Sequence, residues 1–344
     1  MTDHQWEVLL AVIRGERLRP LPTGFIIDSP WLPNWAGHTI MDYLSSEGIW
    51  FDANMRAIRT FPNTLFLPGF WSEFGMCTEP SAFGSAALWG ENDFPYAKKL
   101  LQSPEDVDRL EAPNPRKDGM LPFVIKRLEH LQPEIEKAGH RIRFAVVRGP
   151  LNVASFLMDT TEFLAALKEA PDQMQRLLTI VTDFLVEWIR VQRECFPSID
   201  GMLLLDDIVG FISRNDFETF ARPYLARLFA TDVSVRFFHN DAPCRACAPC
   251  LAELGVNLLN FGVQHTLSEM KSWTDGRVAL LGNLPPRDVL AAGTPEQVRN
   301  ATRSMIEAVP DTSRLIPSCG GGMPPGVPTE NIQAFNAAVE EASA

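Results

Sequence analysis

Residues 202–238 read MLLLDDIVGFISRNDFETFARPYLARLFATDVSVRFF, an apolar run, an amphipathic segment and a second apolar run in succession. The apolar runs at 202–205 and 234–238 have the length and hydrophobicity of buried strands. Residues 215–229, between them, have apolar positions at helical spacing. This order predicts two parallel strands that are joined by a helical crossover.

The same unit recurs along the rest of the chain. Alternating strands and helices, with no break in composition, predict a parallel sheet that closes into a (β/α)8 TIM barrel, a single α/β domain over residues 1–344. A doubly wound open sheet is the alternative. The expected strands are 24–28, 64–67, 143–147, 202–205, 234–238, 257–261, 277–281 and 314–316, and the clearest helical segments are 161–195, 215–229, 243–254, 295–309 and 328–342.

Residues 1–100 are less regular, hold many prolines and contain most of the 8 tryptophans. We expect the first barrel units here, together with long loops over the mouth of the barrel. Aromatic side chains such as Trp31 either stack on a flat ligand or belong to the core.

Composition excludes several classes of partner. The 344-residue chain has a net charge of −12 and a pI near 5.0, which argues against a nucleic-acid or anionic membrane surface. No run approaches the ~18 apolar residues of a membrane span, and residues 1–19 lack the apolar region of a secretory signal. We therefore expect a cytoplasmic protein whose 6 cysteines are thiols, metal ligands or core residues.

The active site of a parallel barrel lies at the carboxyl ends of its strands. Asp206 and Asp207 follow one expected strand and are candidates for acid–base catalysis, although one of them alternatively caps a helix. Arg148 is a candidate anchor for a carboxylate, or a member of a surface ion pair. Other polar side chains near strand ends, expected to bind substrate, are Asp28, Gln264 and Asn283.

His239 and Cys319 also follow expected strands, although they lie far apart in the sequence. Imidazole and thiolate together suit Zn²⁺, and Asp241 or Asp207 offers an oxygen ligand. The alternative is that His239 caps a helix and Cys319 is a small residue in a tight turn.

Cys244, Cys247 and Cys250 form a Cys-x-x-Cys-x-x-Cys pattern that is typical of iron–sulfur or zinc sites. The expected helix at 243–254 disfavours this interpretation, because spacing of three separates the outer two thiols around the helix axis. The alternative is three buried small side chains. Cys244 lies in the expected first turn, where the helix dipole lowers the pKa of a thiol.

Three motifs together resemble the uroporphyrinogen decarboxylase superfamily: GPLNVA at 149–154; LGNLPP at 281–286, followed by GTPEQV at 293–298; and SCGGGMPP at 318–325, followed by PTENI at 328–332. The resemblance implies a (β/α)8 barrel with a deep mouth. True decarboxylases of this type carry an arginine-containing motif near the first strand. The matching residues 25–31 read FIIDSPW and contain no arginine.

The chain is more similar to the cobamide-dependent methyltransferase branch, which includes methylcobamide:coenzyme M enzymes and O-demethylase relatives. In that branch a His-x-Cys pair and a later cysteine bind zinc. His239 and Cys319 match two of these positions, and Asp241 stands in place of the middle cysteine. The resemblance implies methyl transfer between a small thiol or methoxylated substrate and a corrinoid (cobalamin) carried on a partner protein. A metal-free decarboxylase or lyase, and a non-catalytic binding protein, are the alternatives.

Overall fold

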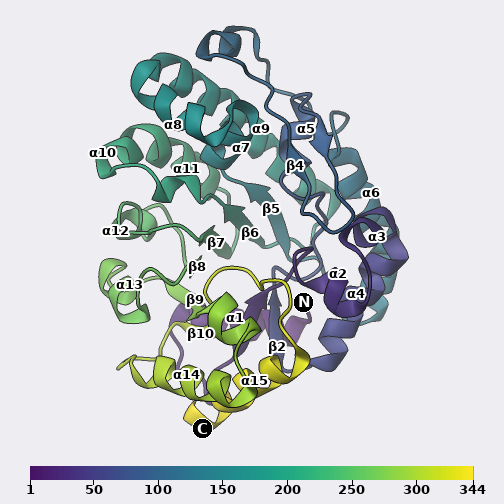
Figure 1. Cartoon of the computed structure of the whole chain (residues 1–344), viewed down its shortest axis with the longest axis vertical. Helices are drawn as coiled ribbons and strands as arrows, with labels where there is room; N and C mark the ends of the chain where they lie inside the picture. The colour runs from purple at the N-terminus through teal and green to yellow at the C-terminus, as the bar shows by residue number, and fades with distance from the viewer. Residues whose placement is uncertain (344) are drawn as a thin grey trace.

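The computed structural model describes residues 1–343 and contains a ring of eight parallel strands (Figure 1). All eight predicted strands are present, so the barrel prediction is confirmed. Several strands extend further than predicted, which places His239, Asn283 and Cys319 inside strands. The barrel strands are β1 (Thr23–Ile26), β2 (Thr64–Leu67), β5 (Phe144–Arg148), β6 (Gly201–Leu205), β7 (Val235–Asn240), β8 (Leu258–Phe261), β9 (Ala279–Leu284) and β10 (Leu315–Cys319).

The wall of the barrel consists of two hydrogen-bonded arcs. One arc has six strands in the order β10-β9-β8-β7-β6-β5, and the other is the parallel pair β1-β2. Strand β1 lies beside β10, and the Met323 amide just beyond β10 donates to the Ile26 carbonyl at 2.9 Å. Gly24 makes this approach possible, because a Cβ there would lie 3.0 Å from Ile316 Cγ2.

Helices surround the strands and cover the outer face of the barrel (Figure 1). A small antiparallel hairpin of β3 (Ala87–Leu88) and β4 (Tyr96–Ala97) lies within the long connection from β2 to β5. The helices are α1 (Asp3–Arg14), α2 (Leu32–Ala36), α3 (Ile40–Ser45), α4 (Glu47–Thr60), α5 (Thr78–Ala82), α6 (Leu121–Lys137), α7 (Pro150–Met158), α8 (Thr160–Glu169), α9 (Pro171–Cys195), α10 (Arg214–Asp216), α11 (Arg222–Phe229), α12 (Ala248–Leu251), α13 (Leu267–Trp273), α14 (Pro295–Glu307) and α15 (Thr329–Ser343), with 3-10 turns η1 (Pro104–Arg109) and η2 (Ile208–Gly210) and π-helical turns η3 (Phe217–Ala221) and η4 (Pro286–Ala291).

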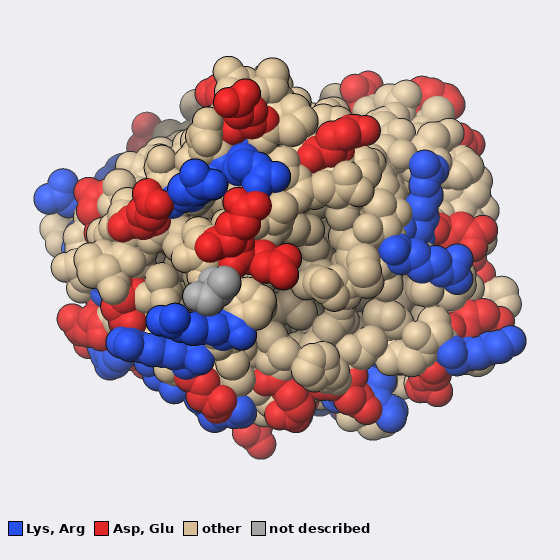
Figure 2. Space-filling view, turned by 90° about the horizontal axis from the view of Figure 1, so that it is seen from below, with Lys and Arg blue, Asp and Glu red and all other residues tan. Residues whose placement is uncertain are grey.

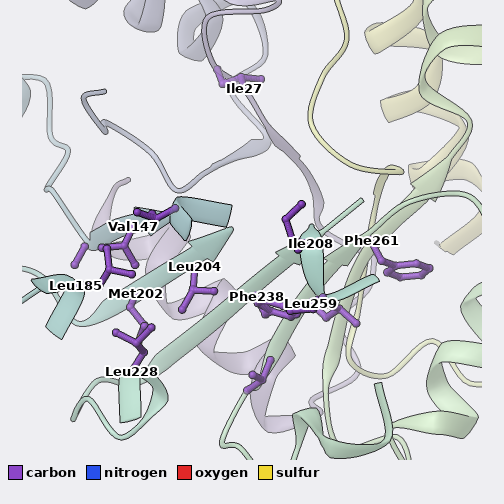
Figure 3. Close-up of a cluster of buried hydrophobic side chains, with 14 of the residues drawn as sticks. Ile27, Val147, Leu185, Met202, Leu204, Ile208, Leu228, Phe238, Leu259 and Phe261 are labelled. Atoms are coloured by element: carbon purple, nitrogen blue, oxygen red, sulfur yellow. The ribbon is translucent and has the colours of Figure 1, made fainter. Parts of the chain in front are cut away.

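Alternate residues of each strand point into the barrel or out toward the helices. In β6, Met202 and Leu204 pack outward in the same cluster as Leu185 of α9 and Leu228 of α11 (Figure 3). Leu203 instead belongs to the interior cluster. Two hydrophobic layers therefore hold each strand.

Helix α1 closes the amino-terminal end of the barrel. Trp6, which is 4% exposed, packs edge-to-face on Phe144 at the start of β5, with ring centroids 5.5 Å apart. Leu9 and Val12 belong to the same interior cluster. Because apolar side chains fill this end, the interior of the barrel is open to a ligand from the carboxyl ends of the strands.

Two sequence predictions about local structure need correction. The predicted helix 243–254 is reduced to α12, a single turn. Pro249 has no backbone N–H to continue a helix from the preceding turn, so it is accommodated only in the first turn of α12. Residues 1–100 are more regular than predicted, since they form α1 to α5. Their short helices depend on local capping, such as the Thr39–Asp42 capping box of α3, more than on a long apolar period.

The face of the molecule seen in Figure 2 carries acidic and basic side chains interspersed around a hollow lined mainly by uncharged residues. Among residues 1–343, no helix has both the length and the apolar character needed to cross a membrane.

Candidate active site

The inward-facing rows of the barrel change from apolar to polar at the carboxyl ends of the strands. In β7, for example, Val235 and Phe237 lie in the interior cluster, and His239 is the next inward position. A cavity of about 320 Å³ opens above this layer. Its polar lining comes from Asp28, Arg148, Asn152, Asp207, His239, Asp241 and Arg287.

His239 is fixed at the base of the cavity by a hydrogen bond. Its Nδ1 lies 2.8 Å from Oδ1 of Asn260, whose amide nitrogen donates to the Leu281 carbonyl. With the Asn260 oxygen as acceptor, Nδ1 carries the proton and Nε2 is directed at other groups. Nε2 lies 3.7 Å from Asp241 Oδ1 and 3.9 Å from Asp207 Oδ1.

The electrostatic environment of this histidine favours its charged form. Burial lowers the pKa of His239, but the carboxylates of Asp241 and Asp207 outweigh burial, so the pKa is raised above its ordinary value. Desolvation raises the pKa of Asp241, and the nearby imidazole partly opposes that effect. The His239 imidazole and the Asp241 carboxyl therefore influence each other's protonation.

The loop that carries Asp241 is held from two sides. The Asp241 amide donates to Asp207 Oδ1 at 2.6 Å. On the other side lies Gly321, which has φ +76°, and a Cβ there would lie only 2.3 Å from Asp241 Oδ1. The glycine turn after β10 therefore makes room for the Asp241 carboxylate.

Asp206 does not face the cavity, contrary to the prediction of a catalytic role. Its fully buried carboxylate accepts hydrogen bonds from the amides of Leu151 at 2.9 Å and Asn152 at 3.1 Å, in the first turn of α7. These hydrogen bonds connect the end of β6 to the start of α7, and the missing side chain of Gly149 leaves room for the Asp206 carboxylate. The sequence alone gave no means of separating Asp206 from Asp207, because the two differ only in which side of the strand they face.

Arg148 lines the cavity, but its charge is already matched. Its guanidinium lies 2.7 Å from Glu73 Oε2 and 3.4 Å from Glu79 Oε2, and all three side chains are buried. Glu79 also accepts from the Arg148 amide at 3.0 Å. Arg148, which was predicted to anchor a substrate carboxylate, thus belongs to a structural ion cluster with Glu73 and Glu79.

Asp28 lines the same cavity, as predicted for a substrate-contacting residue. Burial, together with the negative charge of Glu73, raises the pKa of Asp28 to about 8. Its carboxyl group is therefore mainly protonated at neutral pH and able to donate a hydrogen bond or a proton.

The other predicted substrate-binding residues lie outside the cavity. Trp31 is buried, stacks on Trp35 with ring centroids 4.9 Å apart and donates to the Val327 carbonyl, so it belongs to the core. The side-chain Nδ2 of Asn283 donates to the carbonyls of Gly262 and His265 and fixes the loop after β8. Gln264 is exposed on that same loop.

The predicted metal ligands are brought to one corner but do not form a finished site. Among residues 1–343, no group of three His, Cys, Asp or Glu side chains is arranged to hold a metal ion. Cys319 is fully buried at the end of β10, and its Sγ contacts the Gly321 carbonyl. Burial, together with the nearby negative charge of Asp241, raises the pKa of Cys319 to about 12. Gly321 in turn adjoins Asp241, and His239 and Asp241 both line the cavity. The imidazole, carboxylate and thiol groups at this corner are the donor types that zinc prefers.

The three cysteines at 244–250 do not converge. Asn240 Nδ2 lies 3.5 Å from Cys244 Sγ and 3.8 Å from Cys247 Sγ, whereas Cys250 faces Arg214. A hydrogen bond with Cys247 and burial raise the pKa of Cys244, contrary to the lowering expected from a helix dipole.

Sequence reasoning missed Arg287 and the aromatic wall of the cavity, which includes Phe94 and Phe156. Arg287 comes three residues after β9 ends, just beyond the positions that the strand-end rule selected. The sequence feature that could have indicated Arg287 is its position directly after the LGNLPP motif. Phe94 and Phe156 belong to a long loop and a helix, and nothing in the sequence places these side chains in the cavity.

A parallel barrel with titratable side chains gathered at the carboxyl ends of its strands has the architecture of barrel enzymes. The model of the Uroporphyrinogen decarboxylase (URO-D) family matches residues 7–342. The chain therefore belongs to this family.

Relatives in the family have two kinds of name. A uroporphyrinogen decarboxylase from Anaeromyxobacter sp. (strain Fw109-5) is 26% identical over 254 residues, 71% of this chain and 70% of the relative. A methylated-thiol–coenzyme M methyltransferase from Methanosarcina mazei is 24% identical over 275 residues, 78% of this chain and 71% of the relative. The solved structure of a methyltransferase from Methanosarcina mazei shares the fold, with a TM-score of 0.82, 19% identity and 99% of each chain covered.

Proposed function

We propose that this family member is a zinc-dependent methyltransferase that moves a methyl group between a corrinoid on a partner protein and a small thiol or methoxylated substrate. The observation that supports it best is the orientation of His239. Its Nδ1 is held by Asn260, and its Nε2 is directed at the carboxylates of Asp207 and Asp241. Metal-binding histidines are commonly oriented in this way by a second hydrogen-bonding partner.

The zinc ligands in this proposal are His239, Asp241 and Cys319. Bound zinc supplies Lewis acidity, which favours the thiolate form of a thiol or the departure of an ether oxygen. Histidine, carboxylate and thiolate side chains are all zinc ligands, so these three residues would be able to hold the ion.

Other side chains of the cavity move protons. A thiol acceptor loses its proton as its sulfur takes the methyl group, and the Asp207 carboxylate at the cavity base is placed to receive that proton. In the opposite direction a demethylated oxygen needs a proton, and Asp28 holds one at neutral pH because its pKa is raised to about 8. In this proposal Asp207 is the proton acceptor and Asp28 is the proton donor.

The cavity also suits a small substrate. Its volume of about 320 Å³ is near the lower end of the usual range for small-molecule sites. A porphyrinogen with eight carboxylates requires many cations, whereas the lining contains two arginines, one of which is matched by Glu73 and Glu79.

A metal-free decarboxylase is the second candidate. The names of several relatives favour it, and the protonated carboxyl of Asp28 supplies the acid that protonates a carbanion after loss of carbon dioxide. This alternative requires no metal at His239.

Zinc content decides between the two candidates. We expect about one zinc per chain in protein purified with zinc and without chelators, and a large loss in His239→Ala and Cys319→Ser. Cys195→Ser on α9 and His38→Ala, both outside the cavity, are the matched controls and should retain zinc. Wild-type protein without zinc, or equal zinc in all variants, would contradict the proposal.

Methyl transfer is then measured with methylcobalamin as the donor and a simple thiol as the acceptor. Turnover is followed by the change in cobalamin absorbance. We expect activity that a chelator abolishes and zinc restores. Activity that survives complete removal of zinc would refute the zinc role.

A further inference from the structure

Two arginines line the cavity, and they differ in their partners. Arg148 is 6% exposed and paired with Glu73 and Glu79. Arg287 is exposed, lies on η4 directly after β9, and takes part in none of the ion pairs or side-chain hydrogen bonds found among residues 1–343. The cavity therefore has one cation whose charge no protein carboxylate matches.

The rest of the lining is divided by polarity. His239, Asp207 and Asp241 form the buried polar base. The walls include the apolar side chains of Phe94, Phe156, Met76 and Met323. Because Arg287 is exposed and His239 is 6% exposed, the unmatched cation lies at the rim and the imidazole at the base.

This distribution of charge orients a ligand. An anionic group at the base meets the carboxylates of Asp207 and Asp241, whereas at the rim it meets a guanidinium suited to bidentate pairing with a carboxylate. Two phenyl rings in the wall favour a flat apolar body between these ends.

We infer that Arg287 binds the carboxylate of a small aromatic acid and so directs the opposite end of that substrate to His239. This deepens the proposed function, on which it rests, by assigning the substrate class: an aromatic carboxylate whose reacting heteroatom lies away from its acid group. Arg287 is a substrate-binding residue that sets specificity and takes no part in proton transfer.

The test is calorimetric titration with benzoate and with benzyl alcohol, which has a similar body and no charge. In wild-type protein we expect benzoate to bind about tenfold or more tightly than benzyl alcohol, as for a charge-assisted hydrogen-bonded pair. Arg287→Ala should abolish this preference, and Arg287→Lys should retain part of it. Arg277→Ala is the matched control, because Arg277 is an exposed arginine that precedes β9.

Repeating the titration on His239→Ala separates this inference from the zinc proposal. A benzoate preference that persists there and disappears in Arg287→Ala assigns the carboxylate to Arg287. The inference is overturned if wild-type protein shows no benzoate preference, if Arg287→Ala retains it, or if His239→Ala loses it. Zinc content of Arg287→Ala should equal that of wild type, so failure of either proposal is recognised separately.

Discussion

Replacing Asn260 with leucine tests how far the cavity depends on a residue that does not line it. The side chain is fully buried and makes two hydrogen bonds, each of 2.8 Å, to His239 Nδ1 and to the Leu281 carbonyl. Asn260→Leu leaves both partners unsatisfied. At about 1–3 kcal/mol for each orphaned group, we expect a loss of roughly 2–6 kcal/mol in the free energy of unfolding.

The effect on metal binding is separate. Without its partner, the His239 ring loses its fixed tautomer and orientation, so zinc affinity should fall about 10–100-fold. Urea unfolding measures the first effect, and competition with a chromophoric chelator measures the second. Asn260→Asp keeps the acceptor for Nδ1 and should restore much of the zinc affinity.

Asn257, which directly precedes β8, provides a control for Asn260. Its side chain accepts from the Arg236 amide and donates to the Ser234 carbonyl, each at 2.8 Å, but it lies at the opposite end of the barrel. Asn257→Leu should lower stability and leave zinc affinity unchanged. If Asn260→Leu behaves in the same way as Asn257→Leu, Asn260 has no positioning role and the reasoning is wrong.

Two further predictions concern charge and backbone geometry. Asp28 has a folded-state pKa of about 8 against an ordinary 3.8, so the native state retains a proton that the unfolded chain loses, and wild-type stability should fall as pH rises between these values. Asp28→Asn removes that dependence, so its Tm relative to wild type should increase from pH 5 to pH 9; a difference independent of pH would contradict the assignment. Gly321→Ala should destabilise the fold by about 1–3 kcal/mol and also reduce zinc binding, because its Cβ would displace Asp241. Gly276→Ala, at φ +63° with open space around it, should reproduce only the backbone strain, and equal zinc binding in the two variants would refute the steric argument.

The sequence was sufficient to predict the barrel because each apolar run is short and is followed by turn residues and a helical period. The positions of His239, Asp207 and Asp28 followed from the strand-end rule alone. The same rule could not separate Asp206 from Asp207, because a shift of one residue reverses the side of the strand that a side chain faces.

Other features of the site depend on contacts between distant segments. Arg148 is matched by two glutamates that are about 70 residues away, and nothing local in the sequence indicates that pairing. The same limitation applies to Arg287, which is important because no carboxylate among the described residues pairs with it. The three cysteines at 244–250 are buried, as the alternative to a metal site predicted, although Pro249 interrupts the helix expected there.

The division of the barrel wall into a two-stranded and a six-stranded arc has a mechanical consequence. Asp28 follows β1 on the small arc, whereas His239 and Asp207 belong to the large one. No strand ladder crosses from one arc to the other in the residues described, so side chains and loop contacts hold the two together. The separation between the proton held by Asp28 and the imidazole of His239 is thus set by how side chains and loops pack the two arcs together, and not by hydrogen bonds between strands.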